Sequence, residues 1–116
     1  MELDDLVTGW LALPDLAEAV GEPLTAIRTM VREGRLVTVR RGTPPVQVVP
    51  AEFVHDGALV KGLGGALTVL ADGGFSTEQA LRWLLTAEPG ASERPLDAMA
   101  AGRHHAVKRR AMTLAL

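Results

Sequence analysis

The 116-residue chain contains no cysteine, no tyrosine and few other aromatic residues. The lack of cysteine excludes disulfide bonds, thiolate metal sites and thiol nucleophiles, and it fits a reducing compartment. Aromatic residues make up 3% of the chain and hydrophobic residues 47%, so leucine, valine and alanine must fill the interior. A chain of this length forms one domain, or two very small domains that share a core.

Segments that would place the chain in a membrane or outside the cell are also missing. No apolar run approaches the roughly 20 residues of a membrane-spanning helix. The N-terminal residues MELDDLVTGW are acidic and lack the basic start and apolar run of a signal peptide. The sequence therefore predicts a cytoplasmic protein with no membrane partner.

Side-chain groups that could perform chemistry are equally scarce. Residues 61–65, KGLGG, lack the G-x-x-x-x-G-K-[ST] order of a phosphate-binding loop and are better explained as a turn before a helix. His104 and His105 are adjacent, so on a helix they point about 100° apart and cannot clamp one metal ion. The carboxylates are scattered, and Ser76 and Ser92 have no evident base beside them. We therefore expect no enzymatic activity, no metal site and no cofactor.

The net charge of −2 conceals an uneven distribution along the chain. Residues 1–22 carry six acids and no base, whereas residues 23–50 carry five arginines against Glu33 alone. Residues 51–102 are again acidic, and residues 103–116 carry four bases and no acid. A basic island of this kind suits contact with phosphates, although charges also cluster by chance in short windows. The overall pI near 5.9 argues against indiscriminate binding to polyanions.

Two short helices joined by a tight turn are predicted within residues 13–36. Pro14 suits the first turn of the first helix and Gly21 ends it, while Gly34 follows the last turn of the second. The buried stripes have helical spacing and consist of Leu13, Leu16, Ala17 and Val20 in the first helix and Leu24, Ile27 and Val31 in the second. With only residues 21–23 between them, the two helices form a helix-turn-helix in the geometric sense.

The outward side of the second helix combines short hydroxyls with guanidinium groups. This stripe consists of Thr25, Arg28, Thr29 and Arg32, at i, i+3, i+4 and i+7. It can be the solvated side of an amphipathic surface helix, or it can face a polyanion.

After Gly34 the hydrophobic period changes from helical to alternating. Residues 36–40 and 46–49 are rich in β-branched side chains and flank a loop of glycine, threonine and prolines. We expect these two segments to pair antiparallel as a wing that carries Arg40 and Arg41. The order helix, turn, helix and basic wing is more specific than any one of its parts.

The run LPDLAEAVGEPLTAIRTMVREGRLVTVRRG…VVPAEF resembles the excisionase/MerR-type winged helix-turn-helix domain. It departs from that family at residues 22–24, where an apolar residue and a serine N-cap are more usual. The whole chain is also similar to small actinobacterial winged-helix DNA-binding proteins with a helical C-terminal extension, through LVKGLGGALTVLADGGFS, ALRWLLT, RPLDAMAAGR and KRRA.

The resemblance implies a double-stranded DNA-binding protein, in particular a transcriptional regulator. Its second helix would lie in the major groove and its wing along the DNA backbone. The candidate DNA-contacting residues are Thr25, Arg28, Thr29, Arg32, Arg35, Arg40 and Arg41.

The second half of the chain is predicted to be helical apart from loops. Leu63, Ala66, Leu67 and Leu70 share one face, and Ser76 to Gln79 has the S-x-x-Q form of a capping box. The predicted organisation is a flexible N-terminus in residues 1–9, a winged helix-turn-helix in 10–56 and a helical C-terminal domain in 57–116. The fold class is mainly α with a small two-stranded antiparallel wing.

A second function, of a different class, is also open. Residues 83–110 resemble the toxin-binding C-terminal region of some bacterial antitoxins, with W-L, a loop, R-P-L-D and a small-Gly turn. This implies an interaction module that binds a partner protein or forms a homodimer, with the winged half as its scaffold. We expect the seam of a homodimer on the C-terminal helices, with Trp83, Met99 and Leu114 exposed. A pure adaptor would not require the arginine island.

Overall fold

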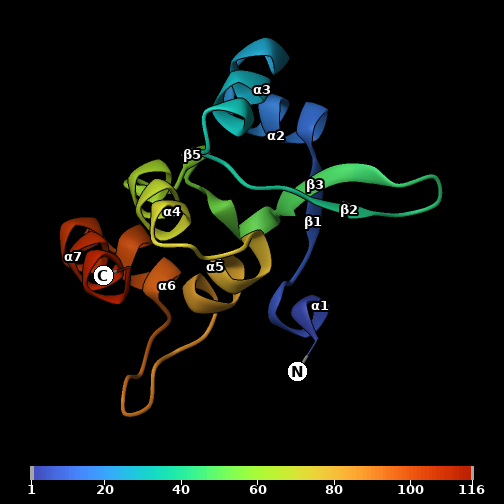
Figure 1. The fold of residues 1–116 in the computed structure, drawn as a ribbon. Coiled ribbons are helices and arrows are strands. Elements are labelled where there is room, and N and C mark those ends of the chain that lie inside the picture. The colour runs from blue at the N-terminus through green and yellow to red at the C-terminus, as the bar shows by residue number, and fades with distance from the viewer. Residues whose placement is uncertain (1, 116) are drawn as a thin grey trace.

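The computed structural model describes residues 2–115, so the terminal residues of the predicted segments 1–9 and 57–116 lie outside the described residues. Figure 1 shows a helix-turn-helix above a small sheet, with the helices of the second half gathered on one side of the sheet and the N-terminal helix below it. The elements of the first half are α1 (Leu3–Leu6), β1 (Trp10–Ala12), α2 (Leu13–Val20), α3 (Leu24–Arg32), β2 (Val39–Arg41), β3 (Val46–Pro50) and η1 (Ala51–Phe53). Those of the second half are β4 (Val54–His55), β5 (Ala58–Leu59), α4 (Leu63–Asp72), α5 (Thr77–Leu84), α6 (Pro95–Ala100) and α7 (His104–Leu114). The predicted fold class is confirmed.

Helices α2 and α3 form the predicted helix-turn-helix. Gly21 follows α2 with φ +70, a left-handed conformation that favours glycine, and its N–H closes the helix on carbonyls of the last turn. Leu16 and Ile27 are fully buried between the two helices and the rest of the core. Leu24 and Val31 are only half-buried, so α3 stands further out than its spacing indicated.

The wing belongs to a sheet of three strands rather than two. Strands β2 and β3 pair antiparallel as predicted, with Arg40 opposite Gln47, but β2 begins at Val39, so residues 36–38 of the predicted strand lie outside it. Strand β1, which sequence analysis missed, pairs antiparallel with the other edge of β3. It contains only three residues and runs directly into α2, so it is too short to show an alternating pattern.

A second small hairpin pairs β4 with β5. Asp56 and Gly57 form its turn with φ values of 53 and 76, the combination that a type I′ hairpin turn requires. The expectation that everything after Gly57 is helix or loop is therefore wrong for Ala58 and Leu59.

The N-terminal segment is not loose over the residues that the structure describes. Leu3 and Val7 are buried, and α1 packs against α5. The sequence pattern did not indicate this contact, because the two buried residues are neighbours of exposed acidic residues in the chain. The prediction of a flexible segment is wrong for residues 2–9.

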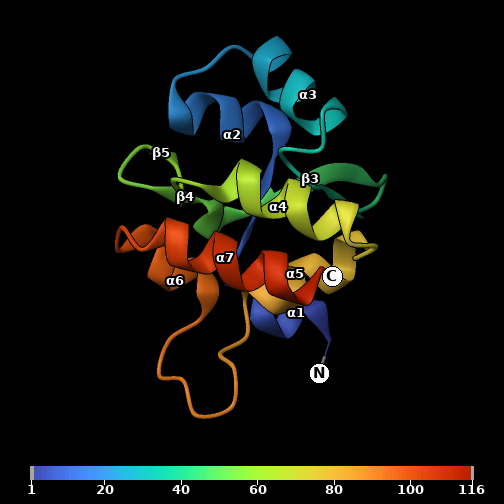
Figure 2. The ribbon, with the colours of Figure 1, turned by 60° about the vertical axis from the view of Figure 1, so that its left-hand side comes forward.

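Helices α4 and α7 lie side by side and run in the same direction (Figure 2). Gly62 at the start of α4 faces His104 at the start of α7, and Gly73 at the end of α4 faces Ala115. A Cβ built on Gly62 would stand 2.6 Å from the Cβ of His104. The absence of side chains at these glycines therefore lets the two helices approach closely.

One hydrophobic core extends from Leu3 to Ala111 and crosses the predicted boundary between residues 56 and 57. The division of the chain into two domains stays a prediction. Ser76 caps α5 through the reciprocal capping box that its sequence predicted. Met99 is 1% exposed and belongs to the core, so the prediction of an exposed Met99 is wrong.

Arg94 joins the two halves of the chain through carboxylates on both sides. It donates two hydrogen bonds of 2.8 Å to Asp97, and its Nη2 lies 2.8 Å from Glu52 Oε2 in η1. The hydrogen bonds from Arg94 lower the pKa of Asp97 below its usual value. The hydrogen bonds and negative charges of Asp97 and Glu52 raise the pKa of Arg94. Glu52 is mostly buried, and its second oxygen, Oε1, has no hydrogen-bond partner among the described residues.

An Arg94→Ala substitution is expected to destabilise the protein by about 1–3 kcal/mol, because it leaves the carboxylate of Glu52 without its partner. Urea unfolding at pH 7 measures this loss. The contribution of Asp97 is present above pH 3.8, its ordinary pKa, and disappears as the pH falls through its lower folded value.

Arg103→Ala is the matched control, since Arg103 pairs with Glu93 at an exposed position. It should cost at most about 1 kcal/mol. Equal losses in the two variants would show that Arg94 does not link the halves.

Candidate nucleic-acid interface

Helix α3, strand β3 and the start of α2 line an open hollow of about 340 Å³. It is lined by Leu13, Arg28, Val31, Arg32 and Gln47. Arg28 and Arg32 are exposed and stand one helical turn apart, so both guanidinium groups can reach the same side of the molecule.

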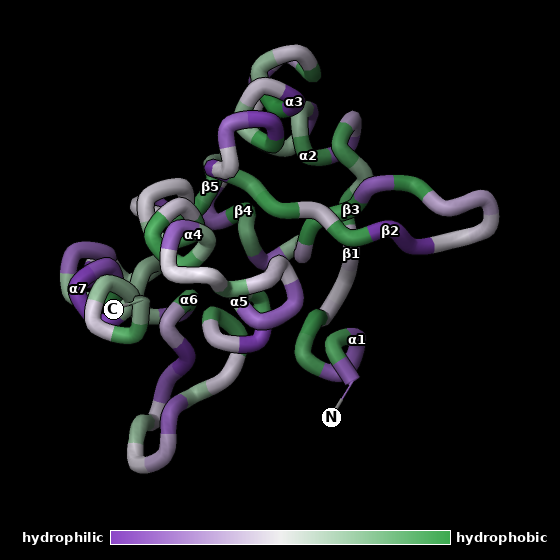
Figure 3. The backbone as a smooth tube through the Cα atoms, in the orientation of Figure 1, coloured by the Kyte–Doolittle hydropathy of each residue, from purple (hydrophilic) through white to green (hydrophobic). Residues whose placement is uncertain are grey.

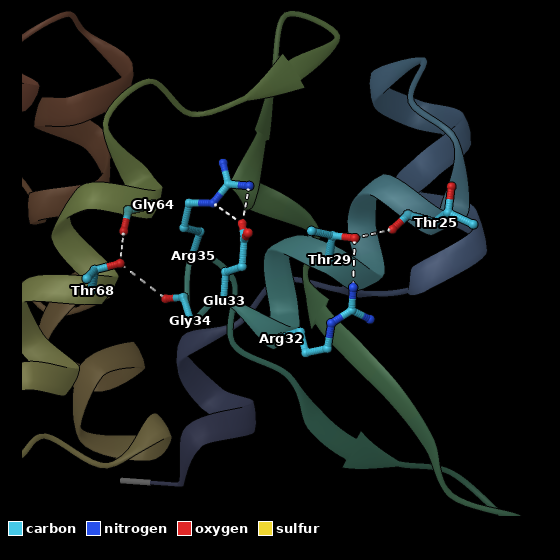
Figure 4. Close-up of polar contacts among 8 residues, drawn as sticks. All are labelled: Thr25, Thr29, Arg32, Glu33, Gly34, Arg35, Gly64 and Thr68. Atoms are coloured by element: carbon cyan, nitrogen blue, oxygen red, sulfur yellow. Dashed lines mark hydrogen bonds and ion pairs between the residues drawn. The ribbon is translucent and has the colours of Figure 1, made fainter.

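Thr29 orients Arg32 rather than pointing freely outward. Its Oγ1 donates to the carbonyl oxygen of Thr25 at 3.0 Å and accepts from Arg32 Nη2 at 3.1 Å (Figure 4). The hydroxyl proton of Thr29 is therefore used within the helix, while Arg32 keeps its other donors. The side chain of Thr25 is exposed.

The register of the sheet separates the two wing arginines. Side chains alternate between the two faces of a strand, and paired residues of antiparallel strands share a face. Arg40 is paired with Gln47, which lines the hollow beside α3, so Arg40 stands on the same face of the sheet as that hollow. Arg41 is paired with Val46 and stands on the other face. Figure 3 shows β2 as a hydrophilic stretch beside more hydrophobic segments.

Arg41 is held by the N-terminal segment. Its Nε donates to Asp4 Oδ1 at 3.1 Å, and its guanidinium carbon lies 5.1 Å from the ring centroid of Trp10. Trp10 Nε1–H donates to the same carboxylate oxygen at 3.1 Å. Cation, ring and carboxylate therefore form one cluster on the face of the sheet away from the hollow.

Arg35 lies away from Arg32, between the end of α3 and α4 (Figure 4). Its Nη2 donates to Glu33 Oε1 at 2.6 Å. Thr68 in α4 lies 3.5 Å from the carbonyl of Gly34, which places α4 against the turn that follows α3.

The five arginines of the basic island thus divide into two groups. Arg35 and Arg41 are paired with carboxylates. Within residues 2–115, no carboxylate lies within 4 Å of the guanidinium groups of Arg28, Arg32 or Arg40. Arg28 and Arg32 line the hollow, and Arg40 is paired with Gln47, which also lines it, so these three cations are available to an anionic partner.

A second group of basic residues lies on α7. Arg110 contacts Glu88 at 2.6 Å and its guanidinium lies over the ring of Trp83, while Arg103 pairs with Glu93. Lys108 and Arg109 are exposed. The loop between α5 and α6 thus neutralises part of this surface.

Within the described part of the chain, no three His, Asp or Glu residues are grouped so that they could hold a metal ion. None of the helices in residues 2–115 has the length and apolar character needed to span a bilayer.

The order of the elements, the three-stranded sheet with its basic strand and the exposed side of α3 define a winged helix-turn-helix with a helical C-terminal part. Comparison with known proteins agrees. Residues 3–54 match the family described as "DNA-binding protein Rv2175c, wHTH domain", and residues 60–115 match "Rv2175c C-terminal domain of unknown function". The chain belongs to the Rv2175c family.

A curated relative, the DNA-binding protein Rv2175c of Mycobacterium tuberculosis (strain ATCC 25618 / H37Rv), is 36% identical over 115 residues. The alignment covers 89% of this chain and 78% of the relative. The NMR structure of Rv2175c superposes with a TM-score of 0.78 at 36% identity and covers 93% of this chain and 82% of that one.

Sequence reasoning missed Gln47 and Thr38, which lie beside the arginines at the hollow. Gln47 Nε2 donates to Thr38 Oγ1 at 3.2 Å. Their position depends on the pairing of β2 with β3, and the only signal in the sequence was the alternation that predicted the wing.

Proposed function

We propose that this protein binds double-stranded DNA through α3 and the face of the wing beside it, and that it acts as a transcriptional regulator. The observation that carries the proposal is that Arg28 and Arg32 line the hollow with Gln47, that Arg40 is paired with Gln47 in the sheet, and that none of the three arginines has a carboxylate partner within residues 2–115. The name of the M. tuberculosis relative, a DNA-binding protein, supports the same function.

We infer different roles for the candidate residues. Thr25, Arg28 and Arg32 on α3 would face base edges and nearby phosphates in the major groove, with Thr29 positioning Arg32. Arg40 on the wing would contact the backbone. Arg35 and Arg41 would contact DNA only by exchanging Glu33 and Asp4 for phosphate.

The salt dependence of binding to random duplex DNA tests this function. If the three unpaired arginines each neutralise one phosphate, the logarithm of the association constant should fall with the logarithm of salt concentration with a slope of about −2.7. Arg40→Ala should make that slope shallower by about 0.9. A full-length protein that shows no binding at low salt would end the proposal.

The ion pair of Arg41 with Asp4 predicts a variant that binds DNA more tightly. Asp4→Asn removes the competing charge but keeps an oxygen that can accept from Trp10. Although Arg41 stands on the face away from the hollow, β2 is an edge strand, so the long side chain of a released Arg41 can turn toward phosphates beside the wing. We expect binding to random duplex to strengthen about 2- to 5-fold, the strength of an exposed ion pair, with a steeper salt slope. Fluorescence anisotropy of a labelled duplex measures both quantities.

Asp5→Asn is the matched control, since Asp5 is the neighbouring exposed acid and has no ion pair within the described residues. It changes the net charge equally without releasing Arg41. The same gain in both variants would mean that the total charge matters and the Asp4 contact does not.

Two narrower interpretations stay predictions. The first is the excisionase/MerR-type affiliation within the winged-helix class. The second is a homodimer or another protein partner on the C-terminal helices, where Leu114 and Met112 are exposed and Trp83 is half-buried beside Arg110.

A further inference from the structure

Among the described residues that line the hollow between α3 and the wing, Gln47 is the one with an uncharged polar side chain. It is the second residue of β3 and is exposed, and it directly precedes the buried Val48 and Val49. A strand position of this kind would suit a β-branched side chain equally well. The burial of apolar surface in the sheet therefore does not require an amide at this position.

The amide of Gln47 is oriented by the neighbouring strand segment. Its Nε2 donates one proton to Thr38 Oγ1 at 3.2 Å. Within residues 2–115, the side chain of Gln47 makes no other hydrogen bond. Its second Nε2 proton and its Oε1 acceptor are therefore available to a ligand. An amide with one free donor and one free acceptor matches the major-groove edge of adenine. The Nε2–H can donate to adenine N7, and Oε1 can accept from adenine N6–H.

The position of this amide relative to the arginines matters as well. Arg28 and Arg32 line the same hollow from α3, and Arg40 lies directly opposite Gln47 in the sheet. Cations on both sides would bring phosphates and bases close to the amide. A neutral side chain adds little to the attraction of phosphate, so its contribution must come from hydrogen-bond geometry.

We propose that Gln47 is a specificity-determining residue of the DNA-binding surface, which reads an adenine beside the bases contacted by α3, and that Thr38 is the positioning residue that orients it. This inference rests on the proposed DNA-binding function. It adds a base-reading group on the wing strand to a surface that is otherwise made of hydroxyls and guanidinium groups.

The experiment selects preferred duplexes from a randomised pool with the full-length protein. It then measures affinities for the selected duplex and for random duplex at one salt concentration. Gln47→Ala should weaken binding to the selected duplex about 5- to 150-fold, the effect of one bidentate base contact, and leave random duplex unchanged. Repeating the selection with Gln47→Ala should abolish the preference for adenine at one position and keep the others.

Two further variants separate orientation from simple presence of the amide. Thr38→Val removes the hydroxyl but keeps the shape of the side chain, so it should weaken binding to the selected duplex by a smaller factor, about 2- to 10-fold. Val46→Thr changes the neighbouring residue on the other face of β3 and should have no effect on either duplex. Thermal melting confirms that the variants are folded.

Equal weakening on selected and random duplex in Gln47→Ala would make Gln47 a phosphate contact and would overturn the inference. Unchanged binding to both duplexes would overturn it as well. Failure of the proposed function has a different signature, since the parent protein itself would then show no DNA binding. A parent that binds but selects no sequence would refute base reading by Gln47 and leave DNA binding in place.

Discussion

An Arg28→Ala variant is expected to bind the preferred duplex about 5- to 150-fold more weakly than the parent protein, with a smaller loss on random duplex. The guanidinium of Arg28 is exposed on the outward side of α3 and has no carboxylate partner within residues 2–115. A free guanidinium in the major groove can pair bidentately with guanine, which contributes about 1–3 kcal/mol of discrimination. Anisotropy titrations on both duplexes at one salt concentration measure the difference.

Arg109→Ala is the matched control for this prediction. Arg109 is also exposed, and no acid within the described residues pairs with it, but it lies on α7. Its removal should leave the preference for the selected duplex unchanged. If Arg109→Ala lost binding while Arg28→Ala bound DNA as tightly as the parent protein, the DNA-binding surface would lie on the basic helix at the C-terminus.

A Gly62→Ala variant is expected to lose about 2–5 kcal/mol of stability. Gly62 has φ +83, where a side chain costs about 1–2 kcal/mol. The added Cβ would also stand 2.6 Å from the Cβ of His104, and overpacking of this kind costs about 1–3 kcal/mol. Urea unfolding measures the loss, and α4 and α7 must separate to relieve the contact.

Gly90→Ala is the matched control, because it measures the cost of backbone strain alone. Gly90 has φ +84, but a Cβ there would meet nothing within 4 Å among the described residues. It should therefore cost only the backbone strain of about 1–2 kcal/mol. Equal losses at Gly62 and Gly90 would contradict the close approach of α4 and α7.

Features that depend on neighbouring residues in the chain were predicted correctly. Helix α2 carries Pro14 in its first turn and ends at Gly21, and it buries Leu13, Leu16 and Ala17 of the predicted stripe, whereas Val20 is half-buried. The capping box at Ser76 and the antiparallel pairing of β2 with β3 were also predicted. Hydrogen bonds within a helix, caps and turns join residues a few positions apart, so the local sequence contains the information for them.

The partners of the arginines could not be read from the same patterns. Arg40 and Arg41 are adjacent and chemically identical, so the sequence pattern predicted the same role for both. The register of β2 on β3 places Arg40 beside α3 and Arg41 on the opposite face, where Asp4, 37 residues away, pairs with it. Sequence spacing contains no information about a partner at that distance.

The sequence by itself therefore determined a helix-turn-helix, a basic wing and a helical second half, because each follows from local periodicity and turn chemistry. Only the tertiary structure decided which arginines are free, that β1 completes the sheet, and that Gln47 faces the hollow beside α3. It also decided that α1 packs against α5 and that α4 and α7 meet through glycines. These outcomes depend on contacts between distant segments, and such contacts form only when the whole chain packs around one core.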